Sequence, residues 1–247
     1  MNVLKGQHAG FIPCRAGSKR FPGKNRAFFN GQPLFMRALA ASELTLDRTI
    51  ISTDDDAILD RATCEKHVRP ARLATGIGYR IDDVVIDMVK NIGEVPEFIH
   101  LIQVTSPFIA PLHIAVAKRL LRDEGIDSVQ LVTLIPNIFH AFSQRVTDDD
   151  GFIRFRYPED RDRCFNSQTK PTHYAFAGYV GFRTESLLKH GNIWGEKSLP
   201  IVGPPECAID IDTPADLEYA EYVLGKRFSI KEELVKNEVV FLNLPLI

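Results

Sequence analysis

Short apolar runs alternate with segments of helical periodicity along most of the chain. The apolar runs predict strands at residues 8–13, 49–53, 98–104, 128–134, 174–182 and 207–211. Helical spacing predicts helices at residues 33–44, 57–66, 81–92, 112–122 and 214–224, and a short helix from residue 185. Because alternating strands and helices form parallel sheets covered by helices, we expect an α/β fold with a doubly wound, mostly parallel sheet in a single domain over residues 1–247.

The alternation is interrupted at residues 137–172. Polar and aromatic residues mix there, with a turn signal at residues 148–151 and an alternating run at residues 152–156. This pattern predicts a hairpin-bearing insertion that is less compact than the sheet core.

The amino-acid composition limits the classes of protein to which the chain can belong. The 247 residues are 45% hydrophobic and 25% charged, which is typical of globular proteins and excludes disordered, collagen-like and coiled-coil chains. A net charge of -2 argues against nucleic acid or an anionic membrane as a partner. The four cysteines lie far apart, with no metal-ligand spacing among the seven histidines, so we expect neither a disulfide framework nor structural zinc. Without a signal-like or membrane-length apolar run, the expected location is cytoplasmic.

A basic loop follows the first predicted strand. It carries five cations and no acidic residue, namely Arg15, Lys19, Arg20, Lys24 and Arg26. Ligands of open α/β sheets bind beyond the carboxyl ends of the strands, where glycines let backbone N–H groups approach phosphates. We therefore expect a polyphosphate-binding loop. The alternative is a solvated basic loop, because the stretch matches neither G-x-x-x-x-G-K-[ST] nor G-x-G-x-x-G.

Two carboxylates stand two residues apart in the last predicted strand, Asp210 and Asp212. Side chains two apart in a strand share a face, so this pair can converge on one cation if the strand stays regular through both residues. Carboxylate oxygens with phosphate oxygens nearby suit Mg²⁺. The alternative is that Asp212 and Thr213 only cap the helix at residues 214–224. The basic loop elsewhere in the chain favours the metal.

Other polar residues receive structural interpretations. Asp54, Asp55 and Asp56 precede a predicted helix, so helix capping is favoured over a metal site. His100 lies within an apolar strand and is interpreted as a hydrogen-bonded core histidine. Cys14 is interpreted as a packing residue.

One string connects the basic loop with a known family. Residues 12–25 read I-P-C-R-A-G-S-K-R-F-P-G-K-N, which resembles the I-P-A-R-G-G-S-K-x-x-P-x-K-N signature of the acylneuraminate cytidylyltransferases, enzymes that activate nine-carbon sugar acids. Similar strings follow in order: I-S-T-D-D at residues 51–55, R-P-A at 69–71, L-I-Q-V-T-S-P at 101–107 and I-D-I-D-T-P-A-D-L at 209–217. The resemblance implies the Rossmann-like sheet of the nucleotide-diphospho-sugar transferases. It also implies transfer of CMP from CTP to the anomeric hydroxyl of a sialic, pseudaminic or legionaminic type 2-keto-3-deoxy sugar acid, with release of pyrophosphate.

The resemblance further implies roles for particular residues. The triphosphate would be held by Arg15, Ser18, Lys19 and Lys24. Other nucleotide contacts would come from Asn25 and, at the cytosine side, Arg69; the sugar acid would face Gln103 and Gln168. Mg²⁺ would be bound by Asp210 and Asp212, which with Arg15 and Lys24 would form the catalytic set. A homodimer would form through residues 137–172, where Phe142, Phe152 and Phe155 are expected to be exposed.

Several positions depart from the family pattern where it contacts sugar or nucleotide. Residues 76–80 read G-I-G-Y-R in place of an Asp and small hydroxyl residues, and Ile109 replaces an Arg. An Arg and an Asn are also missing between residues 167 and 179. Two alternatives therefore stay open: CTP-dependent activation of a different acid, or a nucleotide-binding module without turnover. The string Q-V-T-S-P at residues 103–107 counts against the eight-carbon branch, which has Q-G-D-E-P, and the intact Asp210 and Asp212 pair opposes the module.

Overall fold

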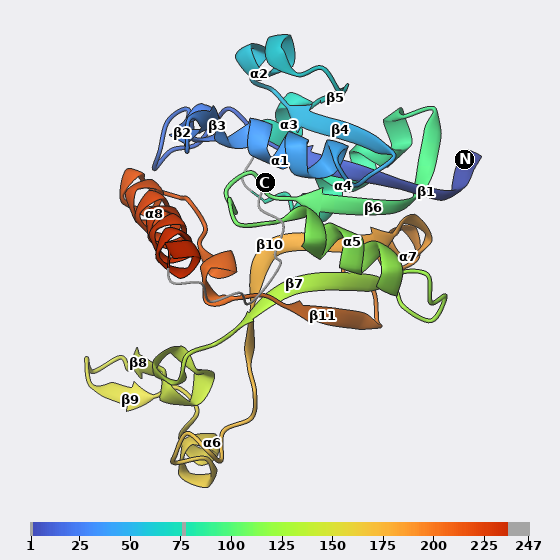
Figure 1. Cartoon of the computed structure of the whole chain (residues 1–247). Coiled ribbons are helices and arrows are strands. Elements are labelled where there is room, and N and C mark those ends of the chain that lie inside the picture. Colours follow the sequence, from blue (N-terminus) through green and yellow to red (C-terminus); the bar gives the residue numbers. More distant parts are fainter. Residues whose placement is uncertain (1, 76–77, 237–247) are drawn as a thin grey trace.

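A computed structural model describes residues 2–75 and 78–236 and has one central sheet (Figure 1). Its strands are β1 (Asn2–Pro13), β4 (Arg48–Thr53), β5 (Glu65–Val68), β6 (Glu94–Ile102), β7 (Ser128–Leu134), β10 (Tyr174–Arg183) and β11 (Ser198–Val202). They lie in the order β11-β7-β10-β6-β1-β4-β5. β10 is antiparallel to both of its neighbours, and the other adjacent pairs are parallel. The predicted mostly parallel α/β sheet is therefore confirmed.

Helices cover both faces of the sheet, and each face has its own apolar core. One core includes side chains of α1 (Leu34–Glu43), α2 (Asp56–Arg61), α5 (Pro111–Leu120) and α8 (Pro214–Lys236). The other includes side chains of α3 (Ala71–Ala74), α4 (Ile81–Asn91) and α7 (Thr184–His190). Phe11 and Ile12 belong to different cores because successive strand side chains point to opposite faces. Among the described residues, no helix is both long enough and apolar enough to cross a membrane.

The insertion lies between β7 and β10 and projects away from the sheet (Figure 1). Its elements are 3₁₀ helices at Asn137–Phe139 and Ala141–Ser143, the strands β8 (Arg145–Thr147) and β9 (Ile153–Phe155), and α6 (Pro158–Arg163). β8 and β9 pair antiparallel, so the predicted hairpin is confirmed. A second short hairpin, β2 (Phe28–Phe29) with β3 (Gln32–Pro33), lies between the basic loop and α1.

Two strands of the central sheet were not predicted, and each is at an edge of that sheet. β5 begins within the last two residues of the helix predicted at residues 57–66, whereas α2 ends at Arg61. Of the four residues of β5 only His67 is buried, so the strand has almost no apolar signal. β11 contains Pro200, which lacks an N–H group and is tolerated mainly in edge strands. The helix predicted at residues 214–224 is longer than expected, because α8 continues as far as Lys236, and residues 237–247 lie outside the described part.

Candidate functional site

Hydrogen bonds fold the basic loop back on itself after β1. The side-chain amide of Asn25, a residue only 8% exposed, donates to the backbone oxygen of Arg15 at 2.9 Å. The N–H of Ala16 donates to Asp54 Oδ1 at 2.7 Å. Gly23 has φ +69°, a left-handed conformation that glycine adopts without steric strain. These contacts fix the loop at the carboxyl ends of β1 and β4.

Two cations of the loop meet one carboxylate from late in the chain. Lys24 Nζ lies 2.8 Å from Asp212 Oδ1, and Arg20 Nη2 lies 2.5 Å from Asp212 Oδ2. The Lys24 side chain is 13% exposed and that of Asp212 is 33% exposed. The hydrogen bond from Lys24 is the largest cause lowering the pKa of Asp212, and the charge of Arg20 acts in the same direction. The fold therefore joins the basic loop to Asp212 across 188 positions of sequence.

The segment that carries Asp212 is tied to its surroundings on two sides. The N–H of Ile211 donates to the backbone oxygen of Thr105, in the loop after β6, at 2.8 Å. The Asp216 carboxylate accepts from the N–H groups of Asp212 and Thr213 at 3.1 and 2.7 Å. The Thr213 hydroxyl in turn accepts from the N–H of Asp216 at 3.3 Å. This reciprocal arrangement confirms the predicted capping of α8 by Thr213.

The strand predicted at residues 207–211 is wrong. Pro205–Ala208 is a 3₁₀ helix, and residues 209–212 have no regular secondary structure. The two prolines at 204 and 205 lack the N–H groups that a strand ladder needs, and the chain turns instead. Asp210 and Asp212 therefore do not share a strand face, and Asp210 is exposed. The described residues contain no group of three or more His, Cys, Asp or Glu side chains able to hold a metal ion.

The acidic residues after β4 cap a helix, as predicted. Asp55 is the N-cap of α2, and its carboxylate accepts a hydrogen bond from the N–H of Ala57 at 3.1 Å. Asp55 also forms an ion pair with Arg26 at 3.1 Å. These carboxylates therefore brace the basic loop and the start of α2.

Arg69 lies buried beside the basic loop, with 5% of its surface exposed. Its Nε donates to Ser52 Oγ at 3.3 Å, and its Nη2 donates to the backbone oxygen of Ser52 at 3.2 Å. Burial lowers the pKa of Arg69, and Tyr79 opposes this shift. The Tyr79 hydroxyl also accepts a hydrogen bond from Arg15 Nη1 at 3.3 Å. Tyr79 thus links Arg69 to the loop, although residues 76 and 77 of the divergent 76–80 segment lie outside the described part.

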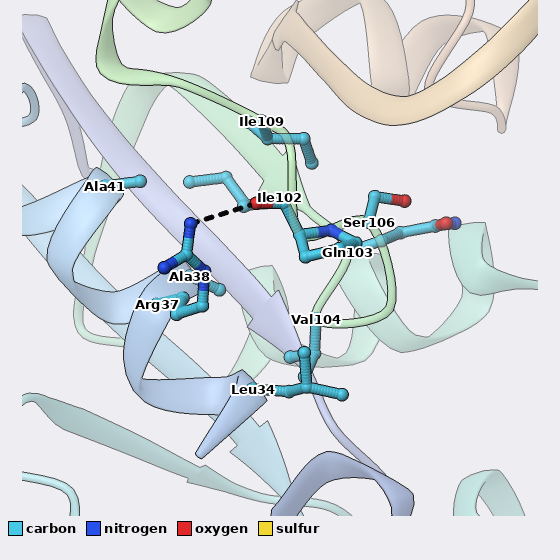
Figure 2. Close-up of a pocket in the computed structure, with 10 residues that line it drawn as sticks. Leu34, Arg37, Ala38, Ala41, Ile102, Gln103, Val104, Ser106 and Ile109 are labelled. Carbon is cyan, nitrogen blue, oxygen red and sulfur yellow. Dashed lines mark hydrogen bonds between the residues drawn. The ribbon is translucent and has the colours of Figure 1, made fainter. Parts of the chain in front are cut away.

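Gln103 follows β6 at the same edge of the sheet as the basic loop. Its N–H donates to the backbone oxygen of Gly178, in β10, at 3.0 Å. Figure 2 shows Gln103 and Ser106 at one end of a small cavity, with Arg37 at the other. Arg37 Nη2 donates to the backbone oxygen of Pro107 at 3.2 Å. Gln103 is therefore held at the carboxyl end of the central strands.

Gln168 lies apart from these residues, in the insertion. It is exposed, and its N–H donates to Asn166 Oδ1 at 2.9 Å. Within residues 2–75 and 78–236, no hydrogen bond or ion pair joins it to another predicted site residue. The fold of one chain therefore gives Gln168 no contact with the basic loop, Gln103 or Asp212.

The interpretations of His100 and Cys14 are confirmed. His100 is fully buried, with Nε2 2.8 Å from His8 Nδ1 and Nδ1 2.7 Å from the Tyr179 hydroxyl. Cys14 is 1% exposed, and burial raises the pKa of its thiol to about 12. A buried thiol with so high a pKa is not a reactive nucleophile.

Comparison with known proteins agrees with this geometry. Residues 9–236 match the sequence profile of the family described as Cytidylyltransferase. The chain belongs to the cytidylyltransferase family. This cytidylyltransferase is therefore a nucleotidyltransferase, and the family resemblance carried by its sequence strings is confirmed.

The relatives of the cytidylyltransferase include enzymes named for several acids. It is 26% identical over 225 residues to the CMP-N,N'-diacetyllegionaminic acid synthase of Legionella pneumophila, covering 86% of this chain and 94% of the relative. It is 25% identical over 240 residues to an N-acylneuraminate cytidylyltransferase of Streptococcus agalactiae, covering 93% of this chain and 56% of that longer relative. It is 28% identical over 253 residues to the 3-deoxy-manno-octulosonate cytidylyltransferase of Parabacteroides distasonis, covering 88% and 98%.

Two solved structures share the fold. One is a CMP:2-keto-3-deoxy-manno-octonic acid synthetase complexed with CTP, with a TM-score of 0.65, 15% identity, and coverage of 90% of this chain and 100% of the other. The second is the 4-diphosphocytidyl-2C-methyl-D-erythritol synthase of Anaerococcus prevotii, with a TM-score of 0.60, 14% identity, and coverage of 89% and 98%. At these identities the likeness establishes the nucleotidyltransferase fold alone.

The cytidylyltransferase site also contains residues to which sequence reasoning gave no role. Arg20 was counted among the loop cations, but only the fold pairs it with Asp212. Tyr79 lies in a segment that departs from the family strings, and nothing in the sequence connects it with Arg15 or Arg69. Thr105 contributes a backbone oxygen, which no residue pattern reveals.

Proposed function

We propose that this cytidylyltransferase transfers CMP from CTP to the anomeric hydroxyl of a 2-keto-3-deoxy sugar acid of the sialic, pseudaminic or legionaminic type. In this reaction the hydroxyl oxygen bonds to the α-phosphorus of CTP, the bond from that phosphorus to the α–β bridging oxygen breaks, and pyrophosphate leaves. The observation that carries the proposal is the meeting of Lys24 and Arg20 with Asp212 at the carboxyl edge of the sheet.

The basic loop is proposed to hold the triphosphate. Arg15 and Lys19 are exposed, and Ser18 is half-buried between them, so these side chains are accessible to a ligand. Lys24 is more enclosed and reaches the opposite wall at Asp212. A triphosphate carries several negative charges, and cations already positioned by the fold stabilise it without reorganisation.

Residues at the same carboxyl edge of the sheet are proposed to contact the nucleotide and the sugar acid. Arg69 and Asn25 are proposed to contact the nucleotide, Arg69 on the cytosine side. Gln103, at the end of β6, is proposed to face the sugar acid. Gln168 is proposed to contact the sugar as well. Because Gln168 lies in the insertion, this contact requires the insertion to approach the site.

Asp210 and Asp212 are proposed to bind Mg²⁺ together with the phosphates of CTP. Mg²⁺ is commonly bound by one or two carboxylates together with substrate phosphates. Asp212 supplies one such carboxylate beside the loop proposed to hold phosphates, and the exposed Asp210, two residues earlier, is proposed to supply the other. When bound, the ion would neutralise charge on the phosphates and so favour attack at phosphorus. Lys24 and Arg20 hold the Asp212 side chain in place for that role.

The insertion is proposed to form a homodimer contact. It exposes several large apolar side chains: Ile138 (75%), Phe139 (66%), Phe152 (65%), Ile153 (72%) and Phe165 (64%). Such a concentration of exposed apolar surface is typical of protein–protein contacts. The expected exposure of Phe152 is confirmed, whereas Phe142 and Phe155 are half-buried because they pack against neighbouring rings and arginines.

Pyrophosphate release from CTP and Mg²⁺ with a panel of keto acids tests the proposal. The panel contains nine-carbon sugar acids, an eight-carbon keto acid and a non-sugar keto acid. Release with a nine-carbon acid is expected. Release only with another acid would redefine the substrate, and CTP binding without release from any acid would identify a binding module.

The same assay tests the metal assignment. Asp210→Asn and Asp212→Asn are each expected to lower turnover by about 100-fold or more, the size of effect seen when charge stabilisation is removed at a reaction centre. Asp60→Asn, an exposed carboxylate on α2, is the control and should retain parental turnover. Near-parental Mg²⁺-dependent activity in either test variant would contradict the assignment.

A further inference from the structure

Beneath Arg69 lies a buried chain of polar side chains from three different elements. Ser52 Oγ, on β4, is 2.9 Å from His67 Nδ1 on β5. His67 Nε2 is 3.1 Å from Asp87 Oδ2 on α4. Ser52 is 0% exposed and His67 is 7% exposed, and 12% of the Asp87 side chain is exposed. Arg69 Nε donates to the same Ser52 oxygen at 3.3 Å, so four side chains form one continuous path.

The ends of this path determine the direction of every hydrogen bond in it. A guanidinium can only donate and a carboxylate can only accept. Asp87 therefore receives the proton of His67 Nε2, which leaves Nδ1 of the neutral ring as an acceptor. The Ser52 hydroxyl donates to that nitrogen, and its oxygen accepts from Arg69. Each member of the path thus has a defined partner.

The path has the residue types of a Ser-His-Asp triad but cannot act as one. A nucleophilic serine must reach its substrate, and Ser52 has no exposed surface. Its oxygen instead faces Arg69, which is the member of the path proposed to touch a ligand. The chemistry available here is therefore orientation of a cation.

Arg69 depends on Ser52 for much of its placement. Two side-chain hydrogen bonds of Arg69 end on Ser52, one on the hydroxyl and one on the backbone oxygen, and Tyr79 is a further hydrogen-bond partner of the Arg69 side chain. The backbone N–H of Arg69 donates to the oxygen of Thr53 at 2.9 Å, which fixes the main chain but not the guanidinium. If the Ser52 hydroxyl rotates, the guanidinium loses one of its two hydrogen bonds to Ser52.

We propose that His67 and Asp87 are positioning residues, which hold the Ser52 hydroxyl so that it orients Arg69 toward the bound nucleotide. This inference rests on the proposed function, because it takes the ligand of Arg69 to be CTP. Asp87 fixes the tautomer of His67, and His67 fixes the rotation of the hydroxyl. Arg72, which is hydrogen-bonded to the other oxygen of Asp87, holds the far end of the path.

Steady-state kinetics and CTP calorimetry on Ser52→Ala and His67→Phe test the inference. Each variant is expected to raise KM and Kd for CTP about tenfold, equivalent to about 1.4 kcal/mol. Turnover number and the KM of the acid should stay within about twofold, since Arg69 is placed at the nucleotide and not at the reacting bond. Glu65→Gln is the matched control, because it removes an ion pair with Arg48 from the same strand without touching the path.

His67→Asn supplies a second readout. Its side-chain oxygen can accept from Ser52 near the position of Nδ1, so this variant should recover most of the CTP affinity lost in His67→Phe. The His67→Asn variant also lacks the imidazole ring, the group that titrates in this path. In the parent, protonation of Nδ1 would turn an acceptor into a donor facing Ser52 and Arg69. Burial lowers the pKa of His67, Asp87 opposes this shift, and the charge of Arg69 adds to it, so His67 becomes protonated only at pH values under the ordinary imidazole pKa of about 6.5. In that acidic range the CTP affinity of the parent should fall more steeply than that of His67→Asn.

The outcomes separate this inference from the proposed function. A parent enzyme that neither binds CTP nor releases pyrophosphate would refute both. An active parent whose KM for CTP is unchanged in Ser52→Ala would overturn the positioning role alone. Lower thermal stability with an equal loss of turnover, and no change in CTP affinity, would assign the path to folding and also overturn it. If His67→Phe does not fold, Ser52→Ala decides the question, because it removes a single oxygen atom.

Discussion

At the scale of single residues, Asp212 shows how the fold pairs the charges of the candidate site. Its two oxygens contact Lys24 and Arg20, which lie near the opposite end of the sequence. Among the described residues, the exposed Arg15 and Lys19 of the same loop form no ion pair, so the loop keeps positive charge that Asp212 does not neutralise. The site is therefore prepared for a ligand with more than one negative charge.

Replacement of Lys24 by Ala is expected to raise the pKa of Asp212, because the Lys24 hydrogen bond is the largest cause that lowers it. A carboxyl group whose pKa is lowered by folding stabilises the protein at pH values above its pKa in the unfolded state, and this stabilisation is lost as the pH falls through its pKa in the folded state. The Lys24→Ala variant should therefore lose less stability on acidification than the parent. CTP should also bind more weakly. NMR titration of the Asp212 carboxyl and calorimetry with CTP measure the two effects.

Lys19→Ala is the control for this prediction. Lys19 is exposed and forms no ion pair with Asp212, so its removal should weaken CTP binding but leave the Asp212 pKa unchanged. An Asp212 pKa that is the same in Lys24→Ala and the parent would contradict the assigned cause. CTP binding as tight as in the parent would show that the phosphate loop is misplaced.

Much of the site was predictable at this scale because its cations cluster in sequence. The loop from Arg15 to Arg26 is visible as a run of charge after an apolar strand. The path through Ser52, His67 and Asp87 was not predictable. Its members lie on three separate elements, and only their packing makes the hydrogen bonds.

At the scale of elements, β10 departs from regular strand pairing at the site. Its register with β7 shifts between Phe176 and Val180, and Gly178 within that interval has φ +77°. A Cβ on Gly178 would lie 1.9 Å from Ser106 Oγ and 2.5 Å from Ser106 Cβ. Only glycine therefore allows β10 to pass this close to the loop after β6.

Gly178→Ala is expected to destabilise the protein by about 2–5 kcal/mol, from a strained left-handed backbone and overpacking against Ser106. Gly191→Ala is the control, because Gly191 has φ +67° but open space around its Cβ position, and about 1–2 kcal/mol is expected there. Urea unfolding measures both values. Equal losses in the two variants would show that the close contact with Ser106 costs nothing.

Elements with strong patterns were predicted well, and those with weak patterns were not. β7 and α4 combine apolar periodicity with clear boundaries, and both lie where the sequence predicts them. The strand predicted at residues 207–211 failed because two preceding prolines favour a 3₁₀ turn over ladder pairing. Edge strands such as β5 bury little, so their sequence carries little signal.

At the scale of the whole molecule, the insertion is the part least explained by one chain. Ile138 and Phe139 lie side by side in sequence with most of their surface exposed. The free energy cost of leaving two such apolar side chains in water is larger than the stability change caused by a typical surface substitution. A second copy of the chain that covers them would remove this cost.

Light scattering is expected to give twice the chain mass of 27.8 kDa for the parent. Ile138→Ser with Phe139→Ser should shift the mass toward that of a single chain, because apolar contact area is lost. Phe28→Ser is the control, since Phe28 is 61% exposed but belongs to β2 outside the insertion. A monomeric parent would refute the dimer, and a dimeric double variant would place the contact elsewhere.

The antiparallel direction of β10 determines where the insertion returns to the sheet. β7 ends at Leu134 and β10 begins at Tyr174, and these two residues are partners in the sheet. Had β10 run parallel to β7, it would have started at the far rim, and the chain would have had to cross the sheet after the insertion to reach it. The inverted strand therefore returns the chain to the edge at which it left, so any lengthening of the insertion adds to the edge that carries the basic loop and leaves the opposite rim unchanged.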